Sequence, residues 1–112
     1  MKSASQRAYS RITREASILL GKSIKLGRQK RKLTTSDLAD RAGISRTTLH
    51  KIESGDLSCE IGLVFEVATL VGVKLFDAEN SSLTGQIDRV DSKIALLPKY
   101  VRKSKRVVDD DF

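Results

Sequence analysis

The stretch TTSDLADRAGISRTTLHKIESG, residues 34–55, decides the fold of this chain. It begins with a threonine, and Asp37 follows three positions later, which is close to the capping box that starts a helix. Gly43 predicts the end of this helix, because the left-handed conformation just after a helix costs glycine least. Ser45 predicts the N-cap of a second helix, and Gly55 predicts its end. We therefore expect two short helices joined by a sharp turn.

Apolar residues occur in this stretch at the spacing of one helical face. Leu38, Ala39 and Ala42 share a face of the first helix. Leu49 and Ile52 lie on the inner face of the second helix. These residues resemble a helix-turn-helix motif, and the resemblance implies a small residue at position 39, because in that motif the second helix crosses close above it. The alternative is an ordinary helical hairpin in a bundle. Here, however, the cap, the small residue, the turn glycine and the inner apolar pair all indicate the helix-turn-helix motif.

These features, with the ending KIESGD at residues 51–56, resemble the helix-turn-helix of phage Cro and repressor proteins, often called the xenobiotic-response-element (XRE) family. The resemblance covers about residues 18–78. It implies an all-α, lambda-repressor-like domain of the five-helix type, and a repressor that binds a palindromic operator in double-stranded DNA. Apolar spacing predicts further helices over about residues 10–31, 60–71 and 83–97.

The resemblance places the second helix in the major groove, where its first residues meet base edges. An arginine there can bind guanine O6 and N7 together, and a lysine can do so less rigidly. Hydroxyls and amides at helix N-termini suit phosphate oxygens. His50 has the alternative of being a solvated surface residue. The expected DNA-binding residues are Thr35, Ser45, Arg46, Thr47, Thr48, His50, Lys51 and Ser54.

An ion pair is also implied by the resemblance. In the resembled family, an arginine late in the first helix pairs with a glutamate at the end of the recognition helix. The matching residues in this chain are Arg28 and Glu53. A bidentate pair would lock the two helices together, whereas two exposed charges would contribute little.

Positive charge is concentrated at the start of the chain. The net charge is +7, and residues 1–32 hold ten Lys or Arg and one Glu, a net charge of +9. Residues 33–112 carry a net charge of −2. This asymmetry beside a helix-turn-helix indicates a polyanionic partner. For residues 1–17, a solubilising extension is the alternative.

Length and composition set the remaining bounds. The chain has 112 residues, of which 39% are hydrophobic and 4% aromatic, so we expect one small domain with extensions at residues 1–17 and 79–112. A single cysteine, Cys59, cannot form an internal disulfide, which is typical of a cytoplasmic protein. We expect no membrane span, metal site, cofactor or catalytic site, and therefore no enzyme.

The segment Val73–Asp77 has the composition of a strand, being short, β-branched and aromatic. No other part of the chain offers it a strand partner, and an unpaired strand edge seeks another chain. We therefore expect it to pair antiparallel with the same segment of a second copy, which makes a homodimer through Val73, Leu75 and Phe76. The alternative is a turn of the fifth helix.

A narrower resemblance concerns the C-terminal part. Residues 75–80 resemble the equivalent part of HipB antitoxins, XRE-type dimers whose C-terminal strands pair. The ending LPKYVRKSKRVVDDDF, residues 97–112, resembles tails of proteins encoded with HipA-type kinases. This implies an antitoxin that represses its own toxin–antitoxin operon and binds a HipA-type serine/threonine kinase or its partner subunit. The alternatives are an antitoxin that acts by binding the kinase directly, and a plain XRE regulator without a toxin.

Overall fold

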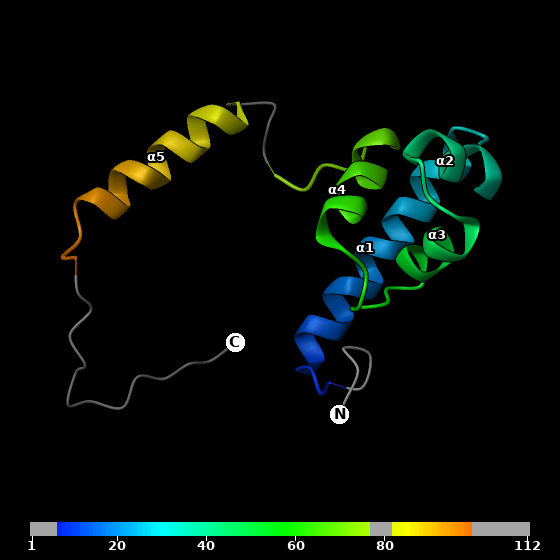
Figure 1. The fold of residues 1–112 in the computed structure, drawn as a ribbon, viewed down its shortest axis with the longest axis horizontal. Coiled ribbons are helices and arrows are strands. Elements are labelled where there is room, and N and C mark those ends of the chain that lie inside the picture. Colours follow the sequence, from blue (N-terminus) through cyan, green and yellow to red (C-terminus); the bar gives the residue numbers. More distant parts are fainter. Residues whose placement is uncertain (1–6, 77–81, 100–112) are drawn as a thin grey trace. The chain divides into compact units, whose positions relative to one another are not determined.

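The computed structural model describes residues 7–76 and 82–99 of the chain. The chain forms two compact units, which divide between Leu75 and Phe76. The described part is helical and contains no β-strand, and its helices confirm the all-α prediction (Figure 1). The first unit holds α1 (Arg11–Lys30), α2 (Thr35–Ala42), α3 (Arg46–Glu53) and α4 (Ile61–Leu70), and the second unit holds α5 (Leu83–Ala95).

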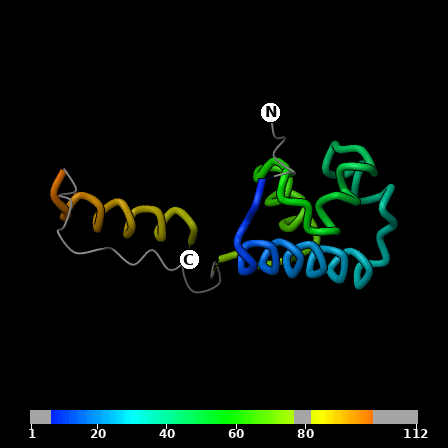
Figure 2. The backbone as a smooth tube through the Cα atoms, turned by 90° about the horizontal axis from the view of Figure 1, so that it is seen from below, coloured from blue at the N-terminus to red at the C-terminus, as the bar shows by residue number. Residues whose placement is uncertain are grey.

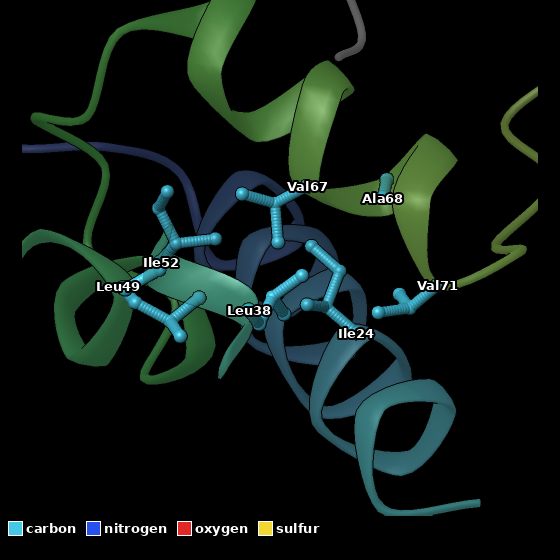
Figure 3. Close-up of a cluster of buried hydrophobic side chains, with 8 residues drawn as sticks. Ile24, Leu38, Leu49, Ile52, Val67, Ala68 and Val71 are labelled. Carbon is cyan, nitrogen blue, oxygen red and sulfur yellow. The ribbon is translucent and has the colours of Figure 1, made fainter. Parts of the chain in front are cut away.

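The core of the first unit joins all four of its helices. In Figure 3 the side chains of Ile24, Leu38 and Val67 point toward one another between the helices. The buried hydrophobic side chains are aliphatic or small, in keeping with the low aromatic content of the chain. Burial of these residues fixes the α2–α3 pair on α1 and α4. The core consists of Ile24, Leu38, Ala39, Leu49, Ile52, Val67, Ala68 and Val71.

Helix α1 runs for 20 residues as one continuous helix (Figure 2). Two glycines on it allow other parts of the chain to approach its backbone closely. A Cβ atom at Gly21 would lie 2.6 Å from the carbonyl oxygens of Ile52 and Glu53. A Cβ atom at Gly27 would lie 2.7 Å from the carbonyl oxygen of Val71. These glycines therefore serve close packing against α3 and the end of α4.

All four helices of the first unit end with the same hydrogen-bond pattern. A residue two or three positions past each helix donates its amide to a carbonyl five residues earlier, which is the Schellman motif. The residue before that donor has a positive φ angle, and in three cases it is a glycine. In the turn after α1 it is Lys32, with φ 56°. The donors and acceptors are Leu33 and Arg28, Ile44 and Ala39, Asp56 and Lys51, and Val73 and Ala68.

The strand predicted for Val73–Asp77 is not supported by the structure. Residues 73–76 form no strand, and Asp77 lies outside the described residues. The amide of Val73 already donates to Ala68 at the end of α4, at 2.8 Å, so it is not available to a ladder. Val73 and Leu75 are half-buried against the core of their own unit, which accounts for the apolar, β-branched composition of this segment without a sheet.

Replacing Lys32 by glycine should stabilise the first unit. A left-handed backbone costs a residue with a Cβ about 1–2 kcal/mol, and glycine gives back part of this in chain entropy, so we expect a gain of about 0.5–1 kcal/mol. Urea unfolding followed by circular dichroism measures the change. Lys25→Gly, at an exposed position inside α1, is the control and should destabilise by about 1 kcal/mol. If Lys32→Gly lowered the free energy of unfolding, the left-handed backbone at Lys32 would not be strained.

Candidate nucleic-acid interface

Helix α3 has a buried face and an exposed polar face. Leu49 and Ile52 are buried in the core, and α3 packs against both α1 and α2. Two of the exposed side chains are cationic, and all of them carry hydrogen-bond donors. This face can therefore meet base edges or phosphates without moving the core. The exposed residues are Arg46, Thr47, His50 and Lys51.

The hydroxyls of Ser45 and Thr48, at the start of α3, are hydrogen-bonded to each other within the protein. Ser45 Oγ accepts from the amide of Thr48 at 3.0 Å, which makes Ser45 the N-cap. Ser45 Oγ also donates to Thr48 Oγ1 at 3.0 Å. Phosphate oxygens need donors, and this hydroxyl hydrogen is already used. The amides of Arg46 and Thr47, which no helical carbonyl can reach, are therefore what this helix end offers to a phosphate.

The N-terminus of α2 carries a negative charge of its own. Asp37 and Thr34 form the predicted capping box, with Thr34 N donating to Asp37 Oδ2 and Asp37 N donating to Thr34 Oγ1, both at 3.0 Å. The backbone amide of Thr34, and secondarily its hydroxyl, lower the pKa of Asp37. An ionised carboxylate thus lies at the helix end where Thr35, a half-buried residue, was expected to meet a phosphate. We conclude that this end is a weaker phosphate site than the sequence suggests.

The turn after α3 is likewise occupied by internal hydrogen bonds. Ser54 Oγ donates to the carbonyl of Lys51 at 2.9 Å, so this hydroxyl supports the helix end. Asp56 accepts from the hydroxyl of Ser58 at 2.6 Å and from its amide at 2.8 Å. These bonds lower the pKa of Asp56, the hydroxyl bond contributing most. The turn is therefore held by its own side chains.

Arg28 and Glu53, the residues predicted to pair, lie in contact and are each only 8% exposed. Arg28 Nε donates to Glu53 Oε2 at 2.7 Å, and a terminal nitrogen donates to Oε1 at 3.1 Å. The other terminal nitrogen donates to the carbonyl of Leu33 at 3.0 Å, a partner that the sequence did not reveal. One guanidinium group thus joins α1, the end of α3 and the α1–α2 turn.

The N-terminal half of α1 also supports the end of α3. Ser17 Oγ donates to the carbonyl of Gly55 at 2.9 Å. A Cβ atom at Gly55 would lie 2.7 Å from Cα of Ile18, so the two segments touch through their backbones. The sequence prediction missed this contact. Its signal was the spacing of Ser17, Gly21 and Arg28 along one face of α1.

Part of the N-terminal positive charge serves the fold. Arg31 donates to the carbonyl of Val71 at the end of α4, where a cation is favourable. Arg11 forms an ion pair with Glu15 at 3.3 Å on the surface of α1. The buried Arg28 is neutralised by its partner. Lys22 and Lys25 remain exposed on α1 and are able to act on an external polyanion.

Within residues 7–76 and 82–99, no helix is long and apolar enough to cross a membrane. No group of three or more His, Cys, Asp or Glu side chains in these ranges is placed to hold a metal ion. Cys59 is half-buried, and burial raises the pKa of its thiol, which favours the unreactive protonated form.

The Arg28–Glu53 pair can be tested by a double-mutant cycle. Arg28→Ala leaves a buried carboxylate without a partner and should lower the free energy of unfolding by about 3–5 kcal/mol. Glu53→Ala likewise leaves the buried guanidinium of Arg28 without its carboxylate partner. The double variant should lose less than the sum of the two single losses. Urea unfolding of the four proteins gives the coupling energy, and full additivity would show that the pair does not act as a unit.

The sequence of this part of the chain is similar to that of known helix-turn-helix proteins. Residues 24–77 match the helix-turn-helix family. An uncharacterized HTH-type transcriptional regulator of Methanocaldococcus jannaschii is 42% identical over 45 residues, which are 40% of this chain and 68% of that protein. No solved structure gave a significant match.

Proposed function

The chain belongs to the helix-turn-helix family of XRE type, and from this premise we propose that it is a sequence-specific DNA-binding transcriptional repressor. The observation that carries the proposal is the exposed face of α3. Its donor side chains lie opposite the buried Leu49 and Ile52. The Arg28–Glu53 pair holds the end of the same helix. A rigid helix with an exposed, donor-rich face is what reading a major groove requires.

The residues of α3 would divide the work of recognition. Arg46 is the first residue of the helix and would bind guanine O6 and N7 together. Thr47 offers a methyl group to thymine or a hydroxyl to other bases, and Lys51 supplies a point charge on the same face. The amides of Arg46 and Thr47 would bind a phosphate and set the register of the helix. His50 completes the exposed face as a base or phosphate contact.

Two copies would act together on one operator. A single helix-turn-helix reads only a few base pairs, which is too little to select a site in a genome. A two-fold dimer doubles the sequence that is read and requires a palindrome whose half-sites lie about 34 Å apart or a multiple of this distance. We therefore include a homodimer in the proposal.

Arg46→Ala tests the proposal on DNA. The operator is first selected from a random duplex library with the wild-type protein. The variant should lose about 1–3 kcal/mol of binding free energy on this operator and little on unrelated DNA. Fluorescence anisotropy at fixed salt measures both affinities. Lys25→Ala removes a charge from α1 and is the control, which should weaken both affinities equally. If Arg46→Ala lost the same binding free energy on both duplexes, Arg46 would contact only phosphate.

A more specific alternative is that the protein is the antitoxin of a HipA-type kinase. It depends on the resemblance of residues 75–80 and 97–112 to HipB-type proteins, and residues 77–81 and 100–112 lie outside the described part of the chain. The test is association of the full chain with a HipA-type kinase encoded beside its gene, compared with a chain that lacks residues 98–112. Absence of such a gene, or of association, leaves the plain regulator.

A further inference from the structure

Helix α5 carries an apolar stripe that is exposed among the described residues of the second unit. None of its residues is buried. The stripe runs from the first residue of the helix to just past its C-terminus. Its members, with their exposed fractions, are Leu83 (51%), Ile87 (59%), Val90 (55%), Ile94 (60%) and Leu97 (67%).

The spacing of the stripe identifies the kind of partner. Its members follow one another at intervals of four, three, four and three residues, which is the a/d pattern of a heptad repeat. A helix that packs on a globular core has a broader stripe, with apolar residues at e or g as well. In α5 these flanking positions are all polar. They are Thr84, Gln86, Asp91 and Lys93. The stripe is therefore a narrow coiled-coil seam.

The residue types within the seam favour a pair of parallel helices. Ile87 and Ile94 occupy the a positions, and leucine or valine occupies the d positions, at 83, 90 and 97. A β-branched residue at a with leucine at d favours a parallel dimer. In that arrangement Gln86 of one copy faces Asp91 of the other, which brings no like charges together.

We propose that the face of α5 is occupied by α5 of a second copy, so that the protein dimerises through a short parallel coiled coil. The proposal rests on the proposed function, which needs two copies on one palindrome, and it names the surface that joins them. In a coiled coil, the a/d stripe of one helix packs against the a/d stripe of another, and a second copy of α5 supplies such a stripe.

The size of the seam agrees with this partner. Two such stripes would bury on the order of 1,000 Å² in total, the lower end of what specific interfaces bury. A groove of about 480 Å³ lies along the seam, lined by Phe76, Leu83, Ile87 and Val90 among others, and gives room for side chains of the partner helix. An isolated helix of only 13 residues is marginal in water, so pairing would also stabilise α5 itself.

The experiment measures the oligomeric state of the full chain by sedimentation equilibrium. The wild type should be dimeric at micromolar concentration, and Ile87→Asp should weaken dimerisation at least 100-fold, because it places a charge in the seam. Ser92→Asp adds the same charge at position f, away from the seam, and should leave the dimer unchanged. Circular dichroism checks that helices α1–α4 persist. A monomeric wild type, or an Ile87→Asp variant that is as dimeric as the wild type, would overturn the proposal.

Two further measurements separate the alternatives. Leu75→Pro should leave the dimer intact, whereas dimerisation through the segment 73–77 would be broken by it. In a Cys59→Ser background, Leu97→Cys should form a disulfide between copies, since position 97 meets itself only in a parallel pair. No disulfide would rule out the parallel seam.

DNA binding then distinguishes this proposal from the proposed function. Ile87→Asp should retain the wild-type affinity for a single half-site and lose affinity for the palindrome. A wild type that dimerises but binds no DNA would leave the seam intact and remove the repressor function.

Discussion

The buried ion pair between Arg28 and Glu53 is the interaction on which the arrangement of the first unit depends. Its two charges are almost entirely removed from water, and their desolvation is offset by two hydrogen bonds to the carboxylate and one to the carbonyl of Leu33. Well-packed apolar residues can match the net stability of such a pair. They cannot match its directionality, because a planar guanidinium fixes distance and angle together. The pair therefore sets the orientation of α3 relative to α1.

The other basic residues near this pair show how position decides the role of a charge. Arg31 lies at the end of α4 and completes a helix terminus, whereas Lys22 and Lys25 face outward on the same helix as Arg28. Asp37 brings negative charge to the start of α2. The electrostatic contribution to DNA binding is thus smaller than a net charge of +9 over residues 1–32 implies.

Much of the fold could be predicted because its signals are local. Caps, turn glycines and a 3.6-residue period located the helices and the inner residues Leu38 and Leu49. The pairing of Arg28 with Glu53 is not local, and only the family resemblance indicated it. The hydrogen bond of Ser17 to Gly55, the bond between the hydroxyls of Ser45 and Thr48, and the bond of Ser54 to Lys51 depend on side-chain rotamers in the folded chain, which no sequence pattern encodes. The strand prediction failed because a short segment with β-branched and other apolar residues also occurs where the chain packs on the core just after a helix ends.

The backbone contact at Gly21 has a consequence for how a complex with DNA would form. Because the carbonyl oxygens of Ile52 and Glu53 lie directly against the backbone of α1 at Gly21, no side chain separates the two helices at this point, and α3 has little room to tilt there. A mismatch between α3 and its operator must then be relieved by the nucleic acid. Sequences that bend or twist easily would be preferred even at base pairs that the protein does not touch. A rigid recognition helix would in this way select DNA sequences that deform easily.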